Sequence, residues 1–166
     1  MIQIRMATAA DIPAIIHIAE VTWPHTYQGI ITEEQIRFML NRFYNEALMA
    51  EQLGQRDHHF LVAEESGKIY GYTHTIRDAE KPGIFKLSKI YILPDAQGQN
   101  LGRKLLDATV AHVLPLGATV LELNVNRSNP AKFFYDKQGF EVVDEVDIPL
   151  DKFWLNDYIM HKKLAF

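Results

Sequence analysis

Apolar side chains near the start of the chain switch from a two-residue period to a helical period. Residues 2–6 alternate between apolar and polar, which predicts a β-strand. Two later stretches place apolar residues three and four positions apart and therefore predict helices, with the faces Ile12, Ile15, Ile16, Ala19 and Ile36, Met39, Leu40, Phe43. Thr8 with Asp11 favours an N-cap before the first helix, and Thr32 with Gln35 has the spacing of a capping box before the second.

Turn residues divide the rest of the chain into short strands and further helices. Residues 64–68 separate two apolar runs, and Gly67 suits a left-handed backbone, so a β-hairpin is expected there. The remaining predicted elements are a helical piece ending at Leu53 before Gly54, strands over 60–63, 69–76 and 85–93, a helix over 100–113, a strand over 119–124, a helix over 130–138, and strands over 140–146 and 158–162. This order is β-α-α-β-β-β-α-β-α-β-β, which is typical of the α/β class.

Residues 94–106 join a predicted strand to a helix through a polar turn that contains Gly98 and Gly102. Glycine lets the backbone turn sharply and allows a ligand to approach closely. The first N–H groups of a helix have no partner within it and lie at the positive end of its dipole, so the turn suits a phosphate. Two other phosphate loops are excluded, because three residues separate the glycines, no Ser or Thr follows Lys104, and no Gly-x-Gly opening is present.

The same turn resembles the Gln/Arg-x-x-Gly-x-Gly/Ala signature of the GNAT superfamily of N-acetyltransferases. The resemblance implies that acetyl-coenzyme A is the cosubstrate and that the loop binds its pyrophosphate through Gln97, Gly98, Gln99, Asn100, Leu101, Gly102 and Arg103. Asn100 stands where the family usually has its first glycine. Because Asn is the non-glycine residue that best tolerates a left-handed conformation, a working loop is still expected.

A second motif follows about twenty-five residues downstream. Asn129 is a good N-cap, Pro130 suits the first helical position, and Gly139 is placed to end a two-turn helix in a left-handed conformation. The stretch is similar to a GNAT motif whose Asn contacts the cosubstrate and whose Tyr hydroxyl faces the thioester sulfur. Asn129 and Tyr135 match these positions, although six residues separate them where the family has seven, so Asn126 or Ser128 could share the role of Asn129.

The two motifs together imply a GNAT fold, a mixed and mostly antiparallel central sheet with helices on both faces. The chain has 166 residues, 48% of them hydrophobic, which is enough for a single N-acetyltransferase domain over residues 1–166. Neither an internal repeat nor a linker is expected.

Charge and composition exclude several other classes of function. Lys and Arg number 17 against 21 Asp and Glu, giving a formal charge of −4, so no basic surface for nucleic acid is expected. The chain contains no cysteine, which excludes a disulfide scaffold, a thiolate nucleophile and a cysteine metal site; no metal is expected. Without a leader pattern or a membrane-spanning apolar run, the sequence predicts a cytoplasmic protein that does not engage a membrane.

Acetyl transfer requires a polarised carbonyl, a protonated leaving thiolate and a deprotonated amine. The resemblance implies that Ile90, Tyr91 and Ile92 line the cosubstrate, with the polarising backbone N–H at a bulge at Tyr91 or Ile92, and that Tyr135 is the acid. No base is assigned. Lys86, Ser88 and Asn124 occupy the strand positions where some relatives carry a carboxylate, and Glu122 is expected to face elsewhere. His25, His74 and Tyr27 could act through water, but such residues more often have a packing or surface role.

The expected acceptor is a primary amine of a small molecule. Residues 22–27 and 154–164 resemble the branch of the family that acetylates spermidine and spermine, and Trp23 and Tyr27 could hold an ammonium group by cation–π attraction. Glu20, Glu33, Glu34 and Glu46 would favour a cationic acceptor. A peptide or protein amine, or a non-catalytic acyl-coenzyme A-binding sensor, is the alternative, and a homodimer is compatible with this interpretation.

Overall fold

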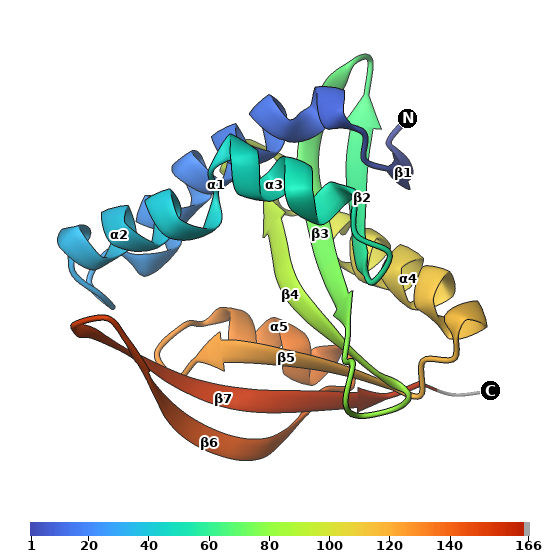
Figure 1. The fold of residues 1–166 in the computed structure, drawn as a ribbon. Helices are drawn as coiled ribbons and strands as arrows, with labels where there is room; N and C mark the ends of the chain where they lie inside the picture. The colour runs from blue at the N-terminus through green and yellow to red at the C-terminus, as the bar shows by residue number, and fades with distance from the viewer. Residues whose placement is uncertain (165–166) are drawn as a thin grey trace.

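The computed structural model describes residues 1–164 and has a mixed α/β architecture (Figure 1). The strands are β1 (Gln3–Met6), β2 (His58–Glu65), β3 (Lys68–Arg77), β4 (Ile84–Ile92), β5 (Val120–Asn126), β6 (Glu141–Leu150) and β7 (Phe153–Lys163). The α-helices are α1 (Ile12–Tyr27), α2 (Glu33–Phe43), α3 (Glu46–Leu53), α4 (Leu101–Val113) and α5 (Ala131–Lys137). The order of elements agrees with the predicted order once the helical piece before Gly54 is counted as α3.

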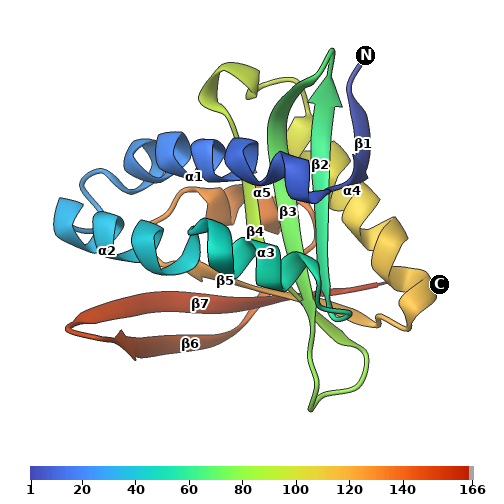
Figure 2. The ribbon, with the colours of Figure 1, turned by 45° about the horizontal axis from the view of Figure 1, so that its top comes forward.

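One seven-stranded sheet runs through the molecule in the order β1-β2-β3-β4-β5-β7-β6. All neighbouring strands are antiparallel except β4 and β5, which are parallel. Helices α1, α2 and α3 cover one face of the sheet, and α4 and α5 lie on the other (Figure 2). The predicted GNAT-type sheet with helices on both faces is therefore confirmed.

Two clusters of buried side chains hold these layers together. The larger cluster joins α1, α2 and α3 to the sheet and includes Ile15, Ile18, Met49 and Tyr72. The second cluster lies between α4, α5 and the strands β4, β5 and β7, and includes Phe85, Leu106, Leu121, Leu123 and Met160. Burial of this apolar area from water supplies the main driving force for folding, and it fixes β4 and β5 between the two helical layers.

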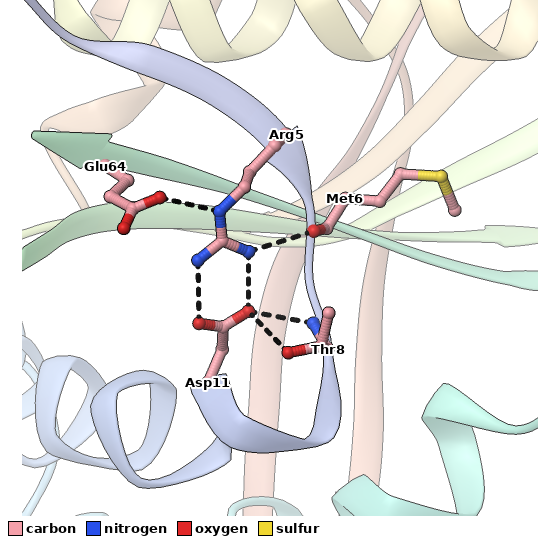
Figure 3. Close-up of polar contacts among 5 residues, drawn as sticks. All are labelled: Arg5, Met6, Thr8, Asp11 and Glu64. Carbon is pink, nitrogen blue, oxygen red and sulfur yellow. Dashed lines mark hydrogen bonds and ion pairs between the residues drawn. The ribbon is translucent and has the colours of Figure 1, made fainter. Parts of the chain in front are cut away.

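An ion-pair network ties the first strand to the first helix (Figure 3). The Arg5 guanidinium makes two bonds to Asp11, from Nη1 to Oδ2 at 2.8 Å and from Nη2 to Oδ1 at 2.9 Å, and its Nε donates to Glu64 Oε2 at 2.7 Å. Asp11 Oδ2 also accepts the Thr8 backbone N–H at 2.8 Å, so the expected cap at Thr8 forms with Asp11 as the acceptor. A short 3₁₀ turn, Ala9–Asp11, leads from this cap into α1.

Local backbone predictions hold at the turns and fail in part at α2. Gly67 and Gly139 both have the expected positive φ, at 81° and 92°. Thr32 Oγ1 accepts the Gln35 N–H at 3.1 Å, but the other half of the expected capping box is wrong. The Gln35 side chain instead donates to the Trp154 carbonyl at 3.2 Å, because β7 lies beside this end of α2.

The last two strands are longer than predicted. Strand β6 continues to Leu150 and β7 begins at Phe153, whereas the predicted strands ended at 146 and began at 158. Strand β6 is the exposed edge of the sheet, and its side chains are mostly in contact with water, so no apolar alternation marks its end. Within residues 1–164, no helix combines the length and apolar character needed to span a bilayer.

Candidate active site

The loop between β4 and α4 has the backbone of an anion-binding turn. Gly98 and Asn100 have φ values of 89° and 58°, so Asn100 adopts the left-handed conformation expected for the position. The first helical bond of α4 runs from the Lys104 N–H to the Asn100 carbonyl at 3.0 Å, and the N–H groups of the residues before Lys104 have no acceptor inside the helix. They point, with the positive end of the helix dipole, toward the mouth of a cavity.

Strands β4 and β5 separate before they reach this loop. They pair only where Ile84–Lys86 faces Val120–Glu122, and beyond that point they diverge. The opening is a cavity of about 570 Å³, here called the first cavity. Its walls include Ile90, Tyr91, Ile92, Gln97, Gly98, Asn100, Leu101, Gly102, Arg103, Leu123, Asn124, Val125, Asn129 and Tyr135. Of the residues expected around the cosubstrate, Gln99 alone does not line this cavity.

The predicted position of the bulge in β4 is wrong. The register of β3 and β4 pairs His74 with Lys89 and then Thr75 with Leu87, so the extra residue is Ser88 and not Tyr91 or Ile92. The sequence around Ser88 carries no glycine or turn residue that would mark a bulge. The extra residue bends β4 next to the point where β5 departs, and this bend helps to open the first cavity.

The backbone of β4 presents free donors to the first cavity. The Leu93 N–H donates to the Tyr70 carbonyl on β3 at 2.8 Å. Because N–H groups alternate in direction along a strand, those of Ile90 and Ile92 point away from β3 and toward the gap left by β5. Two donors at a strand edge can pair with an extended amide chain or polarise a carbonyl.

Helix α5 brings Asn129 and Tyr135 to the far wall of the first cavity. Asn129 Oδ1 accepts the Ala131 N–H at 2.9 Å, which leaves its side-chain NH₂ group to face a ligand. Burial raises the pKa of Tyr135, so its hydroxyl stays protonated. The two residues named as substitutes for Asn129 lie elsewhere: Asn126 lines a neighbouring cavity, and Ser128 is exposed and lines neither.

A second cavity of about 380 Å³ opens beside the first, between α1, α2 and the strands β4, β5 and β7. Five aromatic side chains line it: Trp23, Tyr27, Phe43, Tyr44 and Tyr91. The Trp23 ring lies 4.7 Å from that of Tyr27 and 5.9 Å from that of Tyr44, and Trp23 Nε1 donates to the Tyr44 hydroxyl at 3.1 Å. The two cavities meet at Tyr27, Ser88, Lys89, Tyr91 and Asn124, which line both.

The second cavity also contains charged groups, of which only Lys86 was considered from the sequence. Asp157 on β7 and Lys86 and Lys89 on β4 all line it. Burial raises the pKa of Asp157, and burial lowers the pKa of Lys89 to about 8. One signal was available, because Asp157 interrupts a strand face that carries Leu155 and Ile159, and a carboxylate at such a position is unusual.

The residues considered as bases from the sequence do not reach either cavity, apart from Tyr27. His74 is sealed in the core, with Nε2 2.8 Å from His58 Nδ1, and burial lowers its pKa to about 2. His25 is exposed on α1. Glu122 is bonded to His161 Nε2 at 2.7 Å. Within residues 1–164, no group of three or more His, Asp or Glu side chains is arranged to hold a metal ion.

Comparison with known proteins shows the family to which this chain is similar. A family model described as an acetyltransferase (GNAT) domain matches residues 26–159. An uncharacterised N-acetyltransferase of Mycobacterium tuberculosis is 29% identical over 156 residues, which cover 93% of this chain and 99% of that protein. The spermidine N(1)-acetyltransferase of Thermoplasma acidophilum is 28% identical over 167 residues, covering 98% of this chain and 97% of that protein.

Solved structures resemble the fold over its whole length. The PaiA N-acetyltransferase from Thermoplasma acidophilum, in complex with coenzyme A, has a TM-score of 0.86 at 27% identity, covering 98% of this chain and 99% of that one. The ribosomal-protein-S18-alanine N-acetyltransferase from Escherichia coli has a TM-score of 0.74 at 21% identity, covering 100% and 96%. The second likeness is one of fold alone, so the fold does not identify the acceptor.

Proposed function

This chain belongs to the GNAT family and is an acetyl-coenzyme A-dependent N-acetyltransferase, and we propose that its acceptor is a primary amine of a small molecule, specifically a polyamine. The observation that carries the proposal is the second cavity, which is lined by aromatic rings and by the carboxylate of Asp157, together with Lys86 and Lys89, and is continuous with the first. A cation fits such a lining, since aromatic faces and a carboxylate both attract an ammonium group.

The first cavity fits the cosubstrate. At Gly102 an added Cβ would lie 3.2 Å from Ile92 Cδ1 and 3.3 Å from the Phe134 ring. Glycine therefore fits at this position without displacing its neighbours, and it leaves the backbone accessible to a ligand. In this proposal the loop residues Gln97, Gly98, Gln99, Asn100, Leu101, Gly102 and Arg103 bind the pyrophosphate with their N–H groups and side chains. When bound, acetyl-coenzyme A supplies the acetyl thioester.

The remaining groups of the first cavity act on the thioester end. The Ile92 N–H, next to the loop, pairs with the pantetheine chain beside Tyr91, and the Ile90 N–H, two residues farther from the loop, polarises the thioester carbonyl. Asn129 donates to the same chain through its free NH₂ group. Burial raises the pKa of Tyr135, so its hydroxyl keeps its proton and can donate it to the leaving sulfur.

Support for a polyamine comes from similarity and from the aromatic wall. The chain is similar over its full length to a spermidine N(1)-acetyltransferase. Trp23 and Tyr27, expected from the sequence to hold the acceptor, both line the second cavity. The acidic residues expected to help do not line it: Glu20, Glu33, Glu34 and Glu46 are exposed, and Glu33 is paired with Arg37 at 3.0 Å.

An acceptor screen with a free-thiol readout tests the proposal. Spermidine, spermine, a monoamine of equal length, an amino acid and an alanine-starting peptide are compared at equal concentration with acetyl-coenzyme A. Spermidine or spermine should give the highest kcat/KM. A clear preference for the peptide would assign the chain to protein amines, and a preference for the amino acid would mean that Lys86 and Lys89 bind a carboxylate of the acceptor.

A further inference from the structure

We infer that Asp157 binds the acceptor amine and accepts its proton, which makes it the general base that the sequence did not reveal. This inference rests on the proposed function in one respect, that the acceptor is an amine. Of residues 1–164, Asp157 is the one carboxylate that lines either cavity. Its side chain is mostly buried, with a residue exposure of 8%.

The carboxylate of Asp157 is poorly compensated within the protein. Asn124 Nδ2 donates to Oδ2 at 3.4 Å, which is long for a hydrogen bond. Arg127 is close, but its Nη1 donates to the Asp157 main-chain carbonyl, at 3.3 Å, and its ion pairs are with Glu145 and Asp147. In the described part of the chain, no Lys or Arg side chain forms an ion pair with Asp157. A buried carboxylate without a cation costs free energy, and a bound ammonium group would remove that cost.

Asp157 lies in the cavity next to the one that contains Tyr135, the proposed proton donor to the sulfur. Asn124, its hydrogen-bond partner, lines both cavities. Tyr27 also lines both, and its pKa is raised first by burial and then by the charge of Asp157. Tyr27 in turn raises the pKa of Tyr135. Because Asn124 and Tyr27 line both cavities, the cavity that contains Asp157 is continuous with the one that contains Tyr135, so an amine bound at Asp157 has an open path to the thioester.

The electrostatic surroundings suit a proton acceptor. Burial raises the pKa of Asp157, which strengthens it as a base, while Asn124, Lys86 and Arg127 act in the opposite direction. Lys89 on β4 and the hydroxyls of Tyr27 on α1 and Tyr91 on β4 complete the titratable groups that line the cavity near it, with Tyr44 at the end of α2. A carboxylate with a raised pKa takes a proton more readily from an ammonium group than an exposed one does.

The acetyl transfer consumes one acceptor ammonium and one thioester. The acceptor ammonium gives one proton to an Asp157 oxygen, and the freed nitrogen lone pair forms a bond to the thioester carbonyl carbon. The carbon–sulfur bond then breaks, and the sulfur takes the Tyr135 proton while the nitrogen returns its second proton to the Tyr135 oxygen. Asp157 releases its proton to solvent. The products are the N-acetylamine, free coenzyme A thiol and one proton.

Asp157→Asn tests this assignment, with Asp151→Asn as the matched control. Asp151 is exposed, lines neither cavity and has a φ of 53°, a conformation that Asn tolerates well. For two acceptors of different amine pKa, kcat/KM is measured against pH. In the wild type, kcat/KM for both acceptors should rise over the same pH range, because the pKa of Asp157 sets that range. In Asp157→Asn, kcat/KM at pH 7 should fall on the order of 10²-fold or more, and each limb should move to the pKa of its own amine.

Two further measurements separate a base from a structural residue. Formate should restore part of the rate of Asp157→Ala, because a small carboxylate can enter the vacated space, and coenzyme A affinity by calorimetry should be unchanged in both variants. An unchanged limb in Asp157→Asn, or no rescue by formate, would overturn the inference.

If the wild type acetylates none of the amines, the proposed acceptor class fails. Calorimetry of spermidine with coenzyme A present then decides: binding lost in Asp157→Asn supports the inference, and absent or unchanged binding overturns it.

Discussion

At the scale of single residues, Tyr135 is the side chain whose surroundings best support its proposed role as a proton donor. It is packed edge-on against Phe134 and Phe140, with ring centroids at 5.5 Å and 5.7 Å, and burial raises its pKa. The hydroxyl therefore keeps its proton through the neutral range and can give it up only where a strong base, such as a leaving thiolate, forms beside it.

Tyr135→Phe should lower kcat by something on the order of 10² while the affinity for acetyl-coenzyme A changes little, since the ring packing is kept and the proton donor is lost. Turnover is followed through the released thiol, and affinity by calorimetry. Tyr158→Phe is the control, because Tyr158 packs against the same cluster and lines neither cavity. Equal rates for wild type and Tyr135→Phe would mean that another group protonates the sulfur.

Gly102→Glu should abolish binding of acetyl-coenzyme A. The new side chain would start 3.2 Å from Ile92 Cδ1 and would place a negative charge beside the phosphates. Wild type should also bind the whole molecule much better than an acetyl-pantetheine fragment without the pyrophosphate. Gly54→Glu is the control, since Gly54 has an ordinary φ of −82° and an added Cβ there has no contact closer than 3.5 Å. Equal affinity for fragment and whole molecule would remove the anion-binding assignment of the loop.

Residues differ in how far the sequence alone can assign them. The left-handed Asn100 and the capping Asn129 are local features, decided by neighbours a few positions away, and both could be predicted. Asp157 could not be found in this way. Its proximity to Asn124 depends on the antiparallel register of β5 and β7, residues 33 positions apart, and one sequence does not specify that register.

At the scale of elements, the separation of β4 from β5 creates the site. The two parallel strands pair only along Ile84–Lys86 and Val120–Glu122, and Ser88 inserts an extra residue immediately afterwards. The sequence predicted both strands, but the family resemblance placed the bulge at Tyr91 or Ile92. A bulge is a property of two paired strands, and its position follows from how β3 and β4 align, which the residues of β4 alone do not show.

The junction of β1 with α1 gives a prediction about stability. Hydrogen bonds from Arg5 lower the pKa of Asp11. Its contribution to stability should thus be complete above the unfolded-state pKa of about 3.9 and be lost as the pH falls through the lower folded-state value. Asp11→Asn should lower the free energy of unfolding by about 1–3 kcal/mol at pH 7, because the pair is partly buried and bidentate.

Urea denaturation at pH 7 and at pH 3 measures this effect. The difference between wild type and Asp11→Asn should shrink at the lower pH. Asp136→Asn is the control, because its pair with Lys132 at 2.9 Å lies on the surface of α5 and should be worth less than about 1 kcal/mol. A difference between wild type and Asp11→Asn that stays constant with pH would show that packing, and not the charge of Asp11, is responsible.

At the scale of the whole molecule, the second cavity is bounded by two parts of the chain that are distant in sequence. Helix α2 and the β6–β7 hairpin lie side by side at one end of the molecule (Figure 1). The Gln35 side chain bonds to the Trp154 carbonyl, and Lys152 pairs with Glu34. This hairpin supplies Ile148 and Leu155 to the cavity wall and carries the exposed acid Asp144 on the same face of β6 as Ile148.

This distribution of charge predicts how salt affects the acceptor. In this proposal the amine end of any acceptor meets the buried Asp157, whose attraction salt screens weakly, whereas the remaining charges of a polyamine lie near the exposed Asp144 of β6, where screening is strong. Raising the ionic strength from about 0.05 M to about 0.5 M shortens the Debye length to well under 10 Å. The Michaelis constant for spermidine should therefore rise several-fold, and that for a monoamine of equal length with a neutral tail should rise much less.

Both constants are measured with acetyl-coenzyme A at saturation, so that the cosubstrate phosphates do not contribute. The same salt dependence for both amines would remove the polyamine as the acceptor and would leave the assignment of the cosubstrate cavity intact, because that assignment depends on the β4–α4 loop and not on the charge of β6.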